Sequence, residues 1–128
     1  MIVAGIGCRK GASADDIGAV IGAALARAGF ATKALDLIAA PELKRGEHGI
    51  AAAAAVLGVP LVLIPQADLK AAGARAETRS ERVLALIGIP SVAEAAALAG
   101  GGPTARLILP RIAVGSATCA LAVSEERS

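Results

Sequence analysis

The sequence predicts a three-layer α/β/α domain with a mostly parallel mixed sheet and a C-terminal antiparallel hairpin. Short apolar runs alternate with helical segments through the first half of the chain, which is typical of a parallel sheet covered by helices. Two further apolar runs near the C-terminus are separated only by a short glycine-containing turn, which favours a hairpin. From the length of 128 residues we expect one domain over residues 1–124 and a polar tail over residues 125–128.

The chain begins with an apolar run, Met1–Ala4, that we expect to be the first strand. Gly5–Gly11 follows as an open polar loop. Ser13 and Asp16 are spaced as a capping box, and apolar residues then recur at helical spacing until Gly29. The sequence therefore predicts a strand, a loop and a capped helix in direct succession.

The middle of the chain predicts two more strands and one helix. Ala34–Ile38 is expected to be a short second strand, and Pro41 suits the first position of a helical turn. An alanine-rich helix is expected over about Ile50–Leu57, because Gly58 is well placed to end it. Leu61–Ile64 is a wholly apolar run between prolines, which predicts a central strand covered on both faces.

The segment after the third strand is polar and is followed by two helical patterns. Gln66–Arg79 is expected to be flexible, with at most a turn of helix, and is a candidate for a mobile lid. A capped helix is expected over Ser80–Ile87. Ser91 with Glu94 forms a second capping box, for a helix that ends at Gly100–Gly102.

The C-terminal hairpin and the core are built from aliphatic residues. Arg106–Leu109 and Ala117–Val123 are the expected hairpin strands, and Ser124–Ser128 is expected to fray. Hydrophobic residues make up 55% of the chain, but Phe30 is its one aromatic residue. Ala, Val, Ile and Leu must therefore form the core, and their small size lets helices lie close to the sheet.

Composition and charge exclude several classes of function. The formal charge of +2 forms no basic stripe, and Trp and Tyr are absent, so nucleic acid is not an expected partner. No apolar run reaches the length of a membrane span and no signal peptide is recognisable, so we expect a cytoplasmic protein. Cys8 and Cys119 form no C-x-x-C or Cys/His cluster, which predicts two reduced thiols and no metal site.

The Gly5–Gly11 loop is the best candidate for a ligand site. In open α/β sheets ligands lie beyond the carboxyl ends of the strands, near backbone N–H groups and helix N-termini. Arg9 and Lys10 add positive charge there, which favours a ligand with carboxylate or phosphate groups. The glycines are spaced one residue too far for a dinucleotide fingerprint and no Walker pattern is present, so no nucleotide cofactor is expected.

Four groups of residues, in order along the chain, resemble one protein family. They are Gly5–Gly11; Leu43 and Lys44 with Glu47 and Gly49; Ser80 with Val83 and the run Gly88–Ala96; and Leu109–Arg111 with Thr118, Ala120 and Ala122. In these residues the chain resembles the CobE family and the C-terminal domain of CbiG, from cobalamin biosynthesis. No region is present for the additional N-terminal domains of CbiG, so the chain resembles the stand-alone CobE type of the aerobic pathway.

The resemblance implies work on a corrin-ring intermediate, a precorrin or another corrinoid. Such a ligand carries several acetate and propionate arms around a large and mostly apolar ring, so dispersed cations suit it. The expected ligand-binding residues are Gly7, Cys8, Arg9, Lys10, Gly11, Lys44, Glu47, Ser80, Arg111 and Thr118. The family often has Lys where this chain has Arg111, a change that keeps a carboxylate clamp but removes an amine nucleophile.

The sequence contains only weak candidates for catalysis. Cys8 lies beside two cations near a helix start, a setting that lowers a thiol pKa, or it only supplies a small side chain there. Glu47 is expected to pair with Lys44, with proton transfer as its alternative role, and His48 is the one histidine. We therefore expect a carrier or chaperone for a corrinoid intermediate. The alternatives are a hydrolase or isomerase of a ring substituent, as CbiG acts on cobalt-precorrin-5A, and a structural partner of a precorrin methyltransferase.

Overall fold

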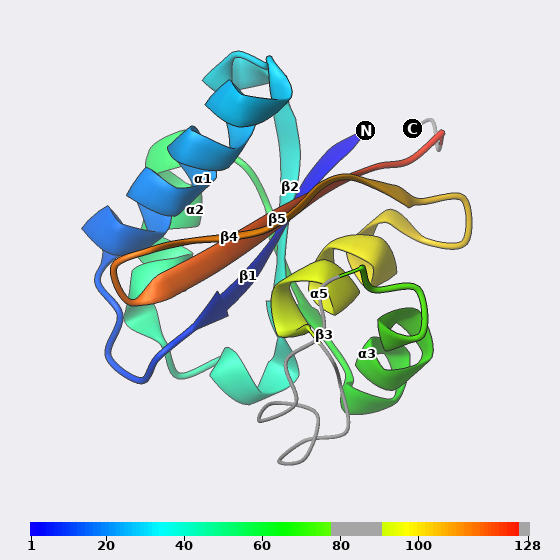
Figure 1. Cartoon of the computed structure of the whole chain (residues 1–128). Coiled ribbons are helices and arrows are strands. Elements are labelled where there is room, and N and C mark those ends of the chain that lie inside the picture. The colour runs from blue at the N-terminus through cyan, green and yellow to red at the C-terminus, as the bar shows by residue number, and fades with distance from the viewer. Residues whose placement is uncertain (78–90, 126–128) are drawn as a thin grey trace.

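The computed structural model describes residues 1–77 and 91–125, which form one five-stranded sheet with helices on both faces (Figure 1). In chain order the elements are β1 (Ile2–Cys8), α1 (Ala14–Ala28), η1 (Thr32–Ala34), β2 (Leu35–Pro41), η2 (Glu42–Lys44), α2 (His48–Leu57), β3 (Leu61–Ile64), α3 (Gln66–Gly73), α5 (Val92–Gly101), β4 (Arg106–Val114) and β5 (Ala117–Val123). The expected helix over Ser80–Ile87 lies outside the described residues.

The strands lie in the order β3-β2-β1-β5-β4. β1, β2 and β3 are parallel, whereas β5 runs antiparallel between β1 and β4. Helices α1 and α2 cover one face of the sheet, and α3 and α5 cover the other (Figure 1). The expected three-layer domain with a mixed sheet and a C-terminal hairpin is therefore confirmed.

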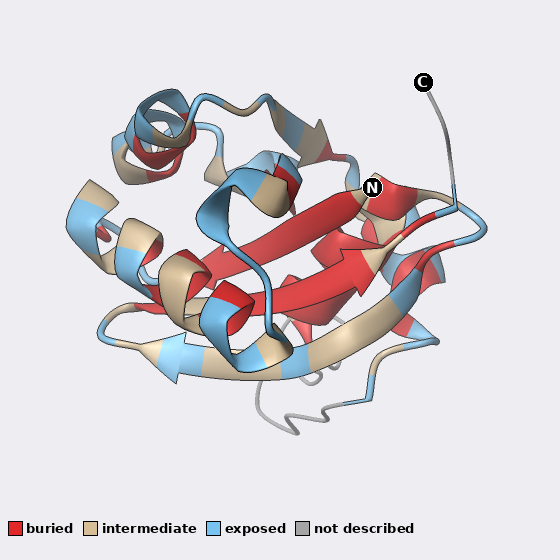
Figure 2. Ribbon diagram, turned by 90° about the horizontal axis from the view of Figure 1, so that it is seen from above, coloured by how far each residue is buried: buried red, intermediate tan, exposed pale blue. Residues whose placement is uncertain are grey.

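The core consists of small aliphatic side chains that alternate along the central strands. Ile2, Ala4 and Ile6 of β1 pack on the side of α1 and α2, whereas Val3 packs on the side of α5. Gly5 lets α5 lie directly on the sheet, because a Cβ there would collide with the carbonyl oxygen of Ala93. Figure 2 shows β1, which starts at the N-terminus, buried along almost its whole length.

β1 is longer than expected and takes in half of the predicted loop. It continues through Cys8, so the polar loop begins only at Arg9. The cause is the distant β5, which pairs with β1 as far as Cys8 opposite Ala117. The prediction that the strand ends at Ala4 is wrong because Gly5 and Gly7, which are typical of a loop, lie within the strand and are needed there for close packing.

β3 lies at an edge of the sheet, and the prediction of a central strand is wrong. Its side chains remain apolar because Leu61 and Leu63 pack against the core beneath α1 and α2. Val62 faces the other way and is 39% exposed. The short run between prolines therefore reflects packing on one face of an edge strand.

Two segments differ from the structure expected for them. Gln66–Gly73 forms helix α3, whose Leu69 is buried against α5, so this part of the predicted lid is a packed helix and not at most a turn of helix. Ser124 is also buried, and its backbone hydrogen bonds with Met1 close the end of the sheet. Fraying from Ser124 onward is thus contradicted at its first residue.

The remaining differences are small. Pro41 ends β2 and precedes the turn Glu42–Lys44 rather than starting it. β4 continues past Leu109 to Val114, and its pairing with β5 shifts register twice on the way.

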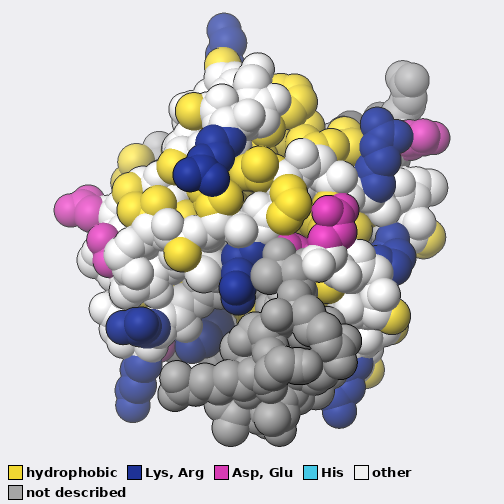
Figure 3. Space-filling view, in the orientation of Figure 1, with side chains coloured by type: hydrophobic (Ala, Val, Ile, Leu, Met, Phe, Trp, Pro, Cys, Tyr) yellow, Lys and Arg dark blue, Asp and Glu magenta, His cyan; other side chains and the backbone are white. Residues whose placement is uncertain are grey.

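No helix of the described residues has the length and apolar character needed to cross a membrane. Lysine and arginine side chains are scattered over the face seen in Figure 3 rather than gathered into a stripe.

Candidate functional site

A cavity of about 590 Å³ lies beyond the carboxyl ends of β1 and β2. It is bounded by the end of β1, the turn η2, the starts of α3 and α5, and the tip of the β4–β5 hairpin. The lining residues are Gly7, Cys8, Arg9, Pro41, Leu43, Lys44, Gln66, Leu69, Val92, Arg111, Ala113, Gly115, Ser116, Ala117 and Thr118. Ligands of open α/β sheets bind at this end of the strands, and the volume suits a small-molecule site.

Three cations from three elements face the cavity. Arg9 follows β1, Lys44 belongs to η2, and Arg111 belongs to β4. No acidic residue is present among the described residues of the lining. Within residues 1–77 and 91–125 the one salt bridge joins Arg45 and Glu42, at 3.9 Å between Nη2 and Oε2, so it neutralises none of the three. The described lining of the cavity is therefore positively charged.

Four apolar residues form another wall of the cavity. Pro41, Leu43, Leu69 and Val92 all line the cavity. Leu43 is 73% exposed and belongs to none of the core clusters, so its apolar surface is available to a ligand in the cavity. The cavity thus combines an apolar surface with separated positive charges.

The loop that carries Arg9 is held from two sides. The backbone N–H of Arg9 donates to the carbonyl oxygen of Ser116 at 2.9 Å, and the N–H of Gly11 donates to Oε1 of Glu47 at 2.7 Å. Gly49 allows the start of α2 to approach this loop, since a Cβ there would collide with the carbonyl oxygen of Ala12. The loop is therefore fixed by backbone contacts, which leave the Arg9 side chain exposed at the cavity.

The tip of the hairpin is fixed by α1. Oδ2 of Asp16 accepts hydrogen bonds from the Ser116 hydroxyl at 2.7 Å and from the Ser116 N–H at 3.2 Å, and the pKa of Asp16 is lowered by them. Ser13 caps α1 as expected, by accepting from the Asp16 N–H at 3.1 Å. The Asp16 carboxylate, however, acts on the hairpin and not on its own helix.

Thr118 and Gly7 form a close pair at the floor of the cavity. The Thr118 hydroxyl donates to the carbonyl oxygen of Gly7 at 3.1 Å. A Cβ at Gly7 would lie only 2.7 Å from that hydroxyl, so glycine is required for the contact. The Thr118 oxygen can still accept a hydrogen bond from a ligand.

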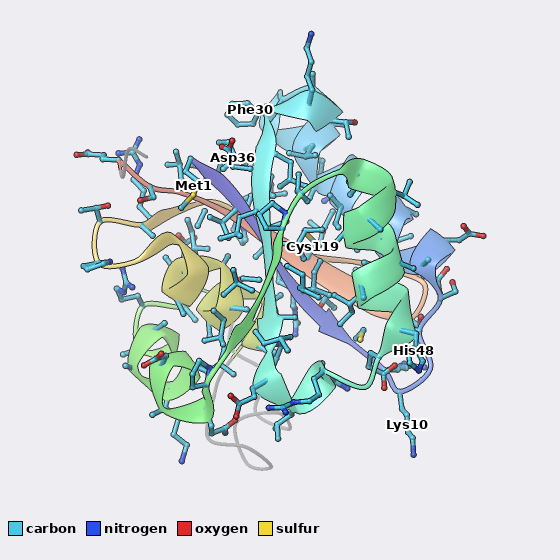
Figure 4. The ribbon with its side chains drawn as sticks, turned by 180° about the vertical axis from the view of Figure 1, so that it is seen from behind. Met1, Lys10, Phe30, Asp36, His48 and Cys119 are labelled. Atoms are coloured by element: carbon cyan, nitrogen blue, oxygen red, sulfur yellow. The ribbon has the colours of Figure 1, made fainter. Side chains whose placement is uncertain are left out.

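The structure brings together six of the ten residues predicted to bind a ligand. Gly7, Cys8, Arg9, Lys44, Arg111 and Thr118 line the cavity. Lys10 does not, and Figure 4 shows its side chain pointing away from the ribbon. Gly11 and Glu47 do not line the cavity either, and the N–H of Gly11 donates a hydrogen bond to the Glu47 carboxylate. Ser80 lies outside the described residues.

The three weak catalytic candidates do not form a reactive group. Burial raises the pKa of the Cys8 thiol, with Lys44 opposing and Glu47 adding to the rise, which contradicts the reading of Cys8 as a thiol of lowered pKa and agrees with its alternative, a small side chain at this position. Glu47 accepts from the Gly11 N–H, and no ion pair joins it to Lys44 in the described structure. His48 is exposed at the start of α2 (Figure 4) and does not line the cavity.

Other features concern the second thiol, metals and the residues that sequence reasoning missed. Cys119 is buried, and burial raises its pKa to about 12. No group of three metal-ligating side chains occurs in the part of the chain that the structure describes. The sequence did not indicate the polar lining residues Gln66 and Ser116 or the apolar wall of Pro41, Leu43, Leu69 and Val92. The hairpin turn next to β1 was the available signal for Ser116, whereas nothing local marked Gln66.

Comparison with known proteins places the chain in a family. The family model described as Cobalamin synthesis G C-terminus matches residues 2–122. The chain belongs to this family. The resemblance seen in the sequence is thereby confirmed, and the matched range 2–122 includes all of the described residues that line the cavity.

Three relatives agree with this assignment. Protein CobE of Sinorhizobium sp is 40% identical over 121 residues, which cover 94% of this chain and 79% of that protein. A crystal structure of CobE, a protein from the cobalamin (vitamin B12) biosynthetic pathway, has a TM-score of 0.89 and 35% identity, covering 99% of this chain and 93% of that one. The cobalamin biosynthesis protein chiG from Agrobacterium tumefaciens str. C58 has a TM-score of 0.78 and 42% identity, covering 98% and 100%.

Proposed function

We propose that this protein binds a corrinoid intermediate of cobalamin biosynthesis in the cavity and carries it between pathway enzymes. One observation carries the proposal. Three cations on separate elements and an apolar wall face the same cavity, and none of its described lining residues is acidic. The ligand that matches is a large apolar ring with several carboxylate arms. The similarity to CobE supports the pathway.

Each part of the cavity has a role in this binding. The face of the ring packs on Leu43, Leu69 and Val92, which removes apolar surface from water. The carboxylate arms reach the two guanidinium groups and Lys44, and an arginine accepts a carboxylate with two parallel hydrogen bonds. Because the cations sit on different elements, they receive different arms and so orient the ring.

The reactive groups support holding a ligand more than changing it. The raised pKa of Cys8 keeps the thiol protonated at neutral pH, so it is a poor nucleophile. The Glu47 carboxylate is occupied by the Gly11 N–H, and His48 lies outside the cavity. A corrinoid with its side arms is too large to be enclosed by a cavity of about 590 Å³. Part of the bound molecule therefore stays accessible for transfer to the next enzyme.

An anaerobic titration with a metal-free corrin polycarboxylate tests the proposal. Binding is followed by the visible absorption of the macrocycle, and each mixture is then analysed by chromatography. We expect a spectral shift with saturation and an unchanged ligand. A new product would show an enzyme instead, and absence of binding would favour a structural partner. The methyl ester of the same corrin is the control, because it keeps the ring and removes the negative charges.

Lys44 and its neighbour Arg45 provide a matched pair of variants. Lys44 lines the cavity, whereas Arg45 is exposed outside the lining and paired with Glu42. We expect Lys44→Ala to weaken binding about tenfold, the effect of losing one charge-assisted contact. Arg45→Ala should leave the affinity within about twofold of the wild type. Equal losses in both variants would indicate that only general positive charge is needed.

A further inference from the structure

The buried carboxylate of Glu94 has no place in ligand binding as described so far. Glu94 lies in the first turn of α5 and is 0% exposed. Its N–H donates to the Ser91 hydroxyl at 3.4 Å, which accounts for the cap of α5. The cap does not account for a buried charge, because burying a carboxylate is costly unless it receives strong hydrogen bonds.

The two oxygens of Glu94 reach two other elements. Oε2 accepts from the backbone N–H of Arg111 in β4 at 2.9 Å, and Oε1 accepts from the N–H of Glu77, after α3, at 2.6 Å. Arg111 lines the cavity, and so do Gln66 and Leu69 of α3. One carboxylate thus ties together two of the walls around the cavity.

The contact falls where β4 departs from regular pairing. Leu109 is opposite Leu121, but Ile112 is opposite Cys119, so β4 has one extra residue between these pairs. Pro110 lies in this interval and has no N–H for the ladder. The next N–H, that of Arg111, is given to Glu94. Such bulges redirect a side chain and need partners for the groups that they leave unpaired.

We propose that Glu94 is a positioning residue that fixes the β4 bulge and thereby presents the Arg111 side chain to the cavity. Glu94 is absent from the lining, so it acts through Arg111 and not on the ligand. The inference rests on the proposed function, because it assigns to Arg111 the binding of a carboxylate arm. It adds that the selectivity of the site depends on a residue that the ligand does not touch.

A double-mutant cycle tests the inference. Glu94→Leu keeps a side chain of similar size but removes both acceptor oxygens, so neither N–H group keeps its partner. We expect Arg111→Ala and Glu94→Leu each to weaken binding of the metal-free corrin polycarboxylate about tenfold. The double variant should bind no more weakly than Arg111→Ala alone, since both changes remove the same contact between Arg111 and the ligand. Arg106→Ala is the control, because Arg106 is exposed on the same strand outside the cavity.

Three results would overturn the inference: losses that multiply in the double variant, a wild-type affinity in Glu94→Leu, or a wild-type affinity in Arg111→Ala. Amide hydrogen exchange of Arg111 provides a measurement that needs no ligand. The N–H should exchange slowly in the wild-type protein and faster in Glu94→Leu. Fast exchange in the wild type would contradict the positioning role even if the variant does not fold. If the wild type binds no corrin, the proposed function fails, while the exchange rates still decide the role of Glu94.

Discussion

Leu43 separates ligand binding from stability more sharply than any other residue of the cavity. It sits in the η2 turn, lines the cavity and is 73% exposed in the free protein. A side chain that exposed contributes little to the folded state. If the cavity holds an apolar ring, most of the Leu43 surface becomes covered only in the complex. We therefore expect Leu43→Ala to reduce affinity without reducing stability.

The exposed fraction sets the size of the effect. Complete burial of a leucine side chain contributes about 2 kcal/mol. With 73% of Leu43 exposed before binding, up to about 1.5 kcal/mol is available to the ligand. That value corresponds to roughly a tenfold rise in Kd for Leu43→Ala. The free energy of unfolding should change by less than about 0.5 kcal/mol.

The assay is the corrin titration together with urea unfolding of the same samples. Val56→Ala is the matched control, because Val56 is 84% exposed on α2 and does not line the cavity. We expect the control to bind like the wild type. Unchanged affinity in Leu43→Ala would refute the apolar wall. A loss of stability above about 1 kcal/mol would show that Leu43 supports the fold instead.

Three further predictions concern packing, pH and thiol chemistry. Gly5→Ala should destabilise the protein by about 1–3 kcal/mol, because its Cβ would collide with α5. Gly22→Ala, at an open position of α1, should stabilise the protein by about 0.5–1 kcal/mol. Urea unfolding tests both, because the two changes in the free energy of unfolding should have opposite signs. The pKa of Asp16 is lowered from 3.8 in the folded protein, so its contribution to stability is complete above that pH and is lost as the pH falls further. Asp16→Asn should flatten the fall in stability between about pH 5 and pH 2, and an unchanged profile would contradict this linkage. Since burial raises the pKa of both thiols, iodoacetamide at neutral pH should modify Cys8 slowly and Cys119 only after unfolding. Intact-mass spectrometry measures the extent of modification. Rapid labelling of Cys8 would show that its thiol is a reactive nucleophile.

Helices α1, α2 and α5 were predictable because their boundaries are encoded locally. Ser13 and Ser91 accept hydrogen bonds at the starts of α1 and α5 as expected. Gly29 and Gly58 end α1 and α2 in the left-handed conformation that favours glycine. All of these signals lie within a few residues of the boundary that they mark.

The errors arise where distant segments decide the structure. β1 reaches Cys8 because β5 pairs with it, and β3 is an edge strand because the hairpin adds to the other side of β1. The two capping boxes show the same limitation in the site. The acids of both boxes, Asp16 and Glu94, bond backbone N–H groups of the C-terminal hairpin. Their spacing predicted a helix start correctly but gave no sign of these remote contacts.

Arg9 was predictable as a site residue from its place in the first loop, and Lys44 and Arg111 from the resemblance to the family, but the orientation of the side chains was not. Arg9 and Lys10 are neighbours in the same loop and looked equivalent in the sequence. In the structure Arg9 lines the cavity, whereas Lys10 is absent from the lining and its side chain points away from the ribbon (Figure 4). The hydrogen bond from the Arg9 N–H to the carbonyl oxygen of Ser116 holds Arg9 beside the hairpin. Ser116 lies near the other end of the chain, so the local sequence gave no sign of this contact.

Arg9→Ala and Lys10→Ala therefore provide the most direct measurement of the central claim, that this cavity binds a polycarboxylate corrin. Both variants remove one positive charge from the same loop, so the net charge of the protein changes equally. The account predicts that Arg9→Ala raises the Kd for the metal-free corrin polycarboxylate about tenfold and that Lys10→Ala changes it by less than about twofold. Equal effects of the two variants, or none from either, would contradict it.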